Sequence, residues 1–126
     1  MNQVDKIHVL VIDDNEDILS MLQAMLTFKG YQASILDKTY ELLNKIKQLH
    51  PDVILMDKLL SGSDGCDFCR QIKKDDAIDR IPVIMISAHP QAKVECLAAG
   101  ADFFIEKPFD MNHLLQTITT AVEGAA

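Results

Sequence analysis

The sequence contains no apolar run long enough to cross a membrane, since a membrane-spanning helix needs about 20 consecutive apolar residues. The apolar run nearest the N-terminus is also too short for the core of a signal peptide, and no cleavage site follows it. We therefore expect a cytoplasmic protein that does not enter a membrane. Cysteine is scarce too, and its odd number, 3, argues against a disulfide framework in a chain without a secretion signal.

Basic residues are fewer than acidic ones. The sequence has 12 Lys and Arg against 19 Asp and Glu, which gives a net charge of −7. This balance disfavours non-specific binding to nucleic acid, whose phosphates it would repel. The glycine-rich loops that hold nucleotide phosphates are missing as well, since neither G-x-G-x-x-G nor G-x-x-x-x-G-K-[ST] occurs. The composition therefore argues against a nucleic-acid-binding domain and against a nucleotide- or flavin-binding module.

What the chain does contain is five short runs rich in Val, Ile and Leu, typical of strands that are buried on both faces. We place these strands near residues 6–12, 31–36, 52–57, 82–87 and 102–106. Segments with helical spacing separate or follow them, at Glu16–Lys29, about 38–49, after Gly65 and through Ile72, at Pro90–Gly100 and behind Asp110. Alternation of strand and helix predicts a single α/β domain over residues 1–126, with a five-stranded parallel sheet and helices on both faces.

Polar side chains follow four of the predicted strands at the point where each strand ends. In chain order they are Asp13 and Asp14, then Asp57, then Ser87, and finally Glu106 and Lys107. The carboxyl ends of parallel strands meet at one edge of a sheet, where open α/β sheets bind ligands. Clustered carboxylates repel one another, and a hard divalent cation relieves that repulsion. The pattern predicts a site for Mg²⁺ and a phosphoryl group, which Asp57 could accept as an aspartyl phosphate.

Taken in order, these residues resemble the receiver domain of the two-component response-regulator family over essentially the whole chain. The resemblance rests on Asp13-Asp14, Asp57, Asp64-Gly65, Ser87-Ala88 and Lys107-Pro108-Phe109. It implies a flavodoxin-like fold with strand order 2-1-3-4-5. It also implies that Asp57 takes a phosphoryl group from a sensor histidine kinase or a phosphotransfer protein. Such a domain forms and loses its own aspartyl phosphate but turns over no external substrate, so we do not expect an enzyme.

The resemblance further implies how a metal ion is held. Asp14, Asp57 and the backbone carbonyl of Leu59 would bind Mg²⁺ directly, and Asp13 would act through a water molecule. The Leu59 side chain has no polar group to orient an attacking water, so we expect slow hydrolysis of the aspartyl phosphate.

The same resemblance implies a switch. Lys107 would neutralise one phosphoryl oxygen, and Ser87 would hydrogen-bond another once the group is present. Phe104 would then turn inward and alter the face that binds a downstream protein, roughly residues 88–122. The family also implies a cis peptide bond between Lys107 and Pro108.

Two residues depart from the family pattern. Ser61 stands where a proline is usual after the acceptor strand, so we expect a looser loop there. Lys58, directly after Asp57, is an unusual basic neighbour of the acceptor.

Two alternative functions remain open. A small Mg²⁺-dependent phosphatase would also form an aspartyl phosphate, but it commonly carries a general acid in a D-x-D motif, and Asp57 is followed by Lys58 and Leu59. A pseudo-receiver that acts only as a docking module is disfavoured because every site residue is present.

The sulfur-containing residues are interpreted as structural. Cys66 and Cys69 have C-x-x-C spacing, but no second cysteine pair or suitably spaced histidines complete a zinc site. We assign Cys69 and Cys96 to the core and regard Cys66 as incidental. The core is also predicted to include Met21, Met25, Met56 and Met85.

Overall fold

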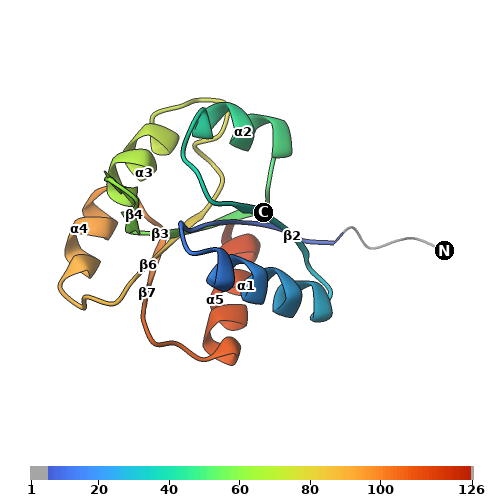
Figure 1. The fold of residues 1–126 in the computed structure, drawn as a ribbon. Helices are drawn as coiled ribbons and strands as arrows, with labels where there is room; N and C mark the ends of the chain where they lie inside the picture. The colour runs from blue at the N-terminus through green and yellow to red at the C-terminus, as the bar shows by residue number, and fades with distance from the viewer. Residues whose placement is uncertain (1–5, 126) are drawn as a thin grey trace.

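The computed structural model describes residues 6–125, and its centre is a five-stranded parallel sheet with helices on both faces (Figure 1). The strands of this sheet are β1 (His8–Ile12), β2 (Gln32–Leu36), β3 (Val53–Asp57), β6 (Val83–Ser87) and β7 (Phe103–Glu106). The helices are α1 (Glu16–Phe28), α2 (Leu42–Leu49), α3 (Gly65–Lys73), α4 (Ala92–Ala98) and α5 (Met111–Ala125). Between β3 and α3 lies an antiparallel hairpin of β4 (Leu59–Leu60) and β5 (Ser63–Asp64).

The strand order β2-β1-β3-β6-β7 confirms the predicted order 2-1-3-4-5, counted over the strands of the sheet. Each strand of the sheet begins within one or two residues of its predicted start. The β4–β5 hairpin was not predicted. Helix α2 starts later than expected, at Leu42, because Glu41 has a left-handed backbone conformation with φ 50°, which a right-handed helix cannot include.

Each strand of the five-stranded sheet contributes side chains to two separate cores. In β1, Val9 and Val11 pack with the cluster under α1 and α5, whereas Leu10 and Ile12 pack with the cluster under α2, α3 and α4. Figure 1 shows these two helix layers on opposite faces of the sheet. Because both faces are buried, the strands carry apolar residues at successive positions rather than at every second one. Full burial of each such side chain contributes about 1.5–3 kcal/mol.

Two interpretations of single residues were wrong. Cys66 is fully buried in the core with Cys69 and Cys96, and its Sγ lies 3.6 Å from the Sγ of Cys96. Met21 is 49% exposed, since it precedes the buried Leu22 on α1 and so points to a different side of the helix.

The described residues include no helix that is both long enough and apolar enough to span a membrane.

Candidate functional site

The register of the sheet brings the ends of its central strands together. Asp57 at the end of β3 pairs with Ile86, and Ser87 at the end of β6 pairs with Glu106. The main-chain bonding continues past the strand ends, where the Lys107 N–H donates to the Ser87 carbonyl at 2.8 Å. Asp13 directly follows β1, the neighbour of β3. The side chains that follow these strands therefore meet at one edge, as the sequence predicts.

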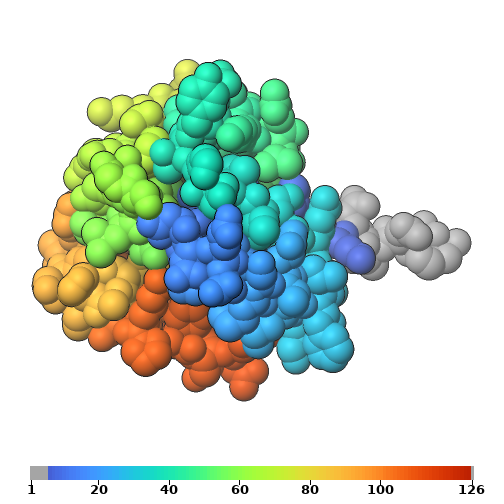
Figure 2. Space-filling model, viewed as in Figure 1, coloured from blue at the N-terminus to red at the C-terminus, as the bar shows by residue number. Residues whose placement is uncertain are grey.

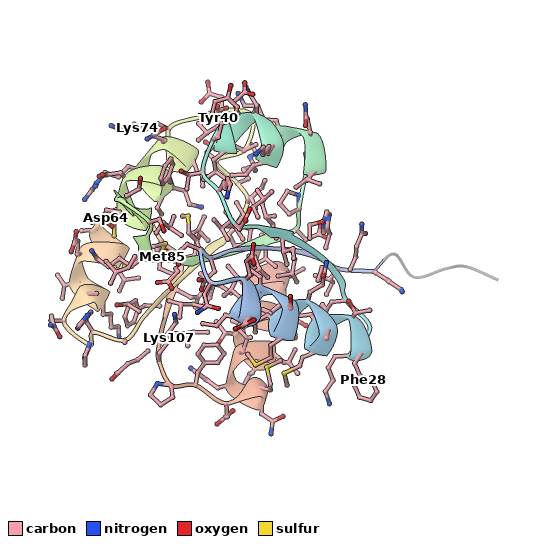
Figure 3. The ribbon with its side chains drawn as sticks, in the orientation of Figure 1. Phe28, Tyr40, Asp64, Lys74, Met85 and Lys107 are labelled. Carbon is pink, nitrogen blue, oxygen red and sulfur yellow. The ribbon has the colours of Figure 1, made fainter. Side chains whose placement is uncertain are left out.

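Lys107 and Asp57 form the central contact of the site. The Lys107 ammonium lies 2.8 Å from Oδ2 of Asp57 and 3.9 Å from Oδ2 of Asp13. The other Asp57 oxygen, Oδ1, accepts a hydrogen bond of 3.1 Å from the backbone N–H of Leu59. Figure 3 labels Lys107 at this end of the sheet, and the Lys107-Pro108 peptide bond is cis, as the family resemblance implies.

Asp13 is the most deeply buried acid of the site, with 6% of its surface exposed. Burial raises the pKa of the Asp13 carboxyl to about 6, and the nearby Asp57 adds to this effect. The backbone N–H of Asn15, which donates to Asp13 at 2.9 Å, and the Lys107 charge oppose it. In contrast, Asp14 is exposed and accepts a hydrogen bond of 2.8 Å from the Ser61 hydroxyl.

The residues at this edge fit a hard divalent cation. The donor groups are the carboxylates of Asp13, Asp14 and Asp57, and oxygen is the ligand atom that Mg²⁺ prefers. The negative charge of Asp57 lies close to Asp13 and adds to the raised pKa of the Asp13 carboxyl. A cation bound here would lower the repulsion between the two carboxylates.

The raised pKa of Asp13 predicts a pH-dependent stability. The folded value, about 6, lies above the ordinary value of 3.8, so the folded state loses stability as the pH rises between these two values. Above about pH 6 the cost is constant, at about 2–3 kcal/mol. We therefore expect Asp13→Asn to raise the free energy of unfolding near neutral pH without Mg²⁺, and to flatten its decline across this range.

Urea unfolding at about pH 4 and near pH 7, in the presence of a chelator, measures this effect. Asp76→Asn is the matched control, because Asp76 is an exposed acid away from the site and its replacement should leave the pH profile unchanged. A loss of stability in Asp13→Asn near neutral pH would contradict the assignment.

Ser87 and Phe104 occupy different environments. Ser87 is 1% exposed, and its Oγ accepts a hydrogen bond of 3.1 Å from the backbone N–H of His89, within its own loop. Phe104 is partly buried against the core on the α2, α3 and α4 face. Their roles in a switch stay predictions.

The Lys58 side chain contacts different groups from those that the Asp57 side chain contacts. Its ammonium lies 3.0 Å from Asp64 and 3.3 Å from Glu95 on α4, so it links the hairpin to that helix. Burial alone would lower the pKa of Lys58, but the hydrogen bonds to the two acids outweigh it and raise the pKa. Asp64, Cys66 and Glu95 are close enough to one another to hold a metal ion, but the Lys58 ammonium already forms ion pairs with both acids. Burial also raises the pKa of the Cys66 thiol, which disfavours the thiolate that a metal requires.

The comparisons with known proteins agree with this geometry. The chain matches the family described as response regulator receiver domain over residues 9–119, and it belongs to that family. It is 33% identical to the phosphate regulon transcriptional regulatory protein PhoB of Pseudomonas aeruginosa, over 85% of this chain and 48% of that protein. The chain thus spans about half the length of the curated relatives it matches.

Solved structures show the same fold. A putative response regulator from Chloroflexus aurantiacus superposes with a TM-score of 0.88 at 26% identity, covering 94% of this chain and 99% of that one. The receiver domain of a sensor histidine kinase from Pseudomonas aeruginosa gives 0.85 at 26% identity, covering 94% and 99%. That structure is described with a magnesium ion coordinated in its active site cleft.

The contacts of three residues beside the site were missed by sequence reasoning. Ser61 was expected only to loosen its loop; it lies in the turn of the β4–β5 hairpin, and its hydroxyl donates to Asp14. The partners of Lys58 were not anticipated. Nor was the role of Asp64, whose Oδ1 caps α3 by accepting the Cys66 N–H at 2.9 Å. An aspartate directly before a helix was the one available signal for this last contact.

Proposed function

We propose that this domain accepts a phosphoryl group on Asp57 from a phosphohistidine, in the presence of Mg²⁺, and thereby changes its partner-binding face. The donor would be a sensor histidine kinase or a phosphotransfer protein, and the domain would act in the cytoplasm. The observation that best supports this is the Lys107 ammonium, 2.8 Å from Asp57, with the Asp13 carboxyl buried beside them. Membership of the receiver-domain family supports it independently.

The chemistry requires little more than a positioned carboxylate. An oxygen of Asp57 attacks the phosphorus, a new O–P bond forms and the N–P bond of the phosphohistidine breaks. The electron pair of that bond stays on the imidazole nitrogen of the donor. The Lys107 ammonium would place a fixed positive charge beside the phosphoryl oxygens and stabilise the negative charge on them.

Asp14, Asp57 and the backbone carbonyl of Leu59 would hold the metal ion directly, and Asp13 would do so through water. When bound, Mg²⁺ would neutralise negative charge on the phosphoryl group and on these carboxylates. A similar receiver domain from Pseudomonas aeruginosa is described with a magnesium ion in its active site cleft, which supports Mg²⁺ as the metal but does not identify its ligands here.

The proposed switch begins at Ser87. Its Oγ accepts from the His89 N–H, and donation to a phosphoryl oxygen would add a contact that exists only in the phosphorylated state. Such a contact would shift the loop after β6, allow Phe104 to turn inward, and change the surface of α4, β7 and α5. A downstream protein would bind that surface.

Intact-protein mass after incubation with a small phosphodonor and Mg²⁺ tests the proposal. We expect one phosphoryl adduct that is acid-stable and labile to hydroxylamine. If the folded protein gains no adduct from a small donor or from phosphorylated histidine kinases, the result would instead favour a docking module that does not use the site. Continuous release of phosphate from a small phosphomonoester would instead support the phosphatase. We expect no such turnover, because Leu59 offers no general acid two residues after Asp57.

Leu59 is 58% exposed and lies beside the acceptor, since its backbone N–H donates to Oδ1 of Asp57. Its side chain cannot orient an attacking water by a hydrogen bond, so we expect a long-lived aspartyl phosphate. Leu59→Asn should speed dephosphorylation several-fold, as measured by loss of the adduct over time. Leu59→Met, which is apolar and of similar size, is the matched control; equal decay in all three proteins would refute the idea.

A further inference from the structure

We infer that the Ser61 hydroxyl is a positioning group for the metal ion, acting through Asp14. The inference rests on the proposed function, in which Asp14 is a direct ligand of Mg²⁺. Its basis is the 2.8 Å hydrogen bond from Ser61 Oγ to Oδ2 of Asp14, two residues far apart in the chain.

The hairpin places Ser61 at a defined point. Leu60 pairs with Ser63, so Ser61 and Gly62 form a two-residue turn between β4 and β5. Gly62 has φ +70°, a conformation that glycine adopts without steric cost. In Figure 2 the green segment that contains the hairpin abuts the blue segment at the start of α1, which follows Asp14.

The hairpin is anchored on both sides of the turn. Leu60 is buried in the core with 6% of its surface exposed. On the other strand, Asp64 is held by the Lys58 ammonium at 3.0 Å and by the Cys66 N–H at 2.9 Å. Packing and charged hydrogen bonds therefore support the turn, and the anchored hairpin holds the Ser61 hydroxyl in position to donate to Asp14.

This support matters because Asp14 is exposed and lacks the packing that holds Asp13. The Ser61 hydroxyl occupies Oδ2 of Asp14 and leaves Oδ1 for a cation. Hydrogen-bonding partners of a metal-ligating carboxylate fix its orientation, and their loss typically lowers metal affinity by about 10–100-fold. Because both groups are at the surface, we expect an effect of about tenfold, the lower end of that range.

Calorimetric titration with MgCl₂ of the unphosphorylated wild type, Ser61→Ala and Ser61→Thr tests the inference. Ser61→Ala should weaken Mg²⁺ binding about tenfold. Ser61→Thr keeps the hydroxyl and should retain most of the affinity. Thermal unfolding without Mg²⁺ should be nearly the same for all three, because the hydrogen bond is exposed. Unchanged Mg²⁺ affinity in Ser61→Ala, or an equal loss in Ser61→Thr, would overturn the inference.

A double-mutant cycle with Asp14→Asn separates action through Asp14 from a general effect on the loop. In the Asp14→Asn background, Ser61→Ala should cause little further loss of affinity; a loss as large as in the wild type would overturn the inference. The outcomes for the two proposals are distinct. Wild type that fails to bind Mg²⁺ contradicts the proposed function, whereas wild type and Ser61→Ala that bind equally well contradict only the role of Ser61.

Discussion

Asp57→Asn is expected to abolish phosphoryl labelling of this domain and to leave its fold intact. The carboxylate and the amide have almost the same shape, but the amide is not a competent nucleophile toward phosphorus. The amide oxygen can still accept hydrogen bonds from the Lys107 ammonium or the Leu59 N–H, so the local structure should persist. Replacing one of several clustered carboxylates also lowers their mutual repulsion.

The measurement is the mass of the intact protein after incubation with a small phosphodonor and Mg²⁺, beside the wild type. Asp37→Asn is a suitable control, since Asp37 is an exposed acid that follows β2 at the same edge of the sheet and should not affect labelling. Unchanged stoichiometry of labelling in Asp57→Asn would refute the assignment of the acceptor. Urea unfolding of the variant shows separately that the fold is kept.

Gly65→Ala is expected to destabilise the protein severely. Gly65 is the first residue of α3 and is buried against the end of β3, where its N–H donates to the Lys58 carbonyl at 2.6 Å. An added Cβ would collide with the backbone carbonyl oxygen of Asp57 and would lie only 3.2 Å from the Cα of Lys58. Both are backbone atoms at the carboxyl end of the central strand β3, so they cannot move aside as a flexible side chain can. We expect a loss of about 3 kcal/mol or more, at the upper end of the cost of overpacking a core.

Urea unfolding of Gly65→Ala beside Gly124→Ala measures this effect. Gly124 lies near the end of α5, and a Cβ there would meet nothing within 4 Å, so its replacement should leave stability unchanged or slightly raised. Stability of Gly65→Ala within about 0.5 kcal/mol of the wild type, the usual effect of a neutral surface change, would contradict the packing described here. Because the collision is with Asp57 itself, phosphoryl labelling should also slow in any Gly65→Ala protein that folds.

The main features of the site could be predicted because they follow from local patterns. Successive apolar residues from Val9 to Ile12 mark a strand buried on both faces, and Asp13 follows that strand directly. The same reasoning applies to Asp57 at the end of β3 and to Lys107 after β7. Parallel pairing then requires these ends to meet at one edge.

The starts of helices and the environments of single residues were less predictable. Helix α2 was expected from about residue 38, but the left-handed conformation of Glu41 delays it, and no glycine signals that conformation. Met21 and Cys66 were assigned wrongly, because the side that a residue shows to the core depends on how its element is rotated against the sheet.

By itself, the sequence determined the α/β class, the strand order through its family resemblance, and which acids and which lysine stand at strand ends. Only the tertiary structure decided that Ser61 reaches Asp14, that Lys58 binds Asp64 and Glu95, and that Cys66 lies against Cys96. The physical reason is the separation along the sequence of the residues that determine each feature. Strand and helix periodicity reflects burial of neighbouring residues, whereas these contacts join separate segments whose meeting depends on the path of the β4–β5 hairpin and the placement of α4.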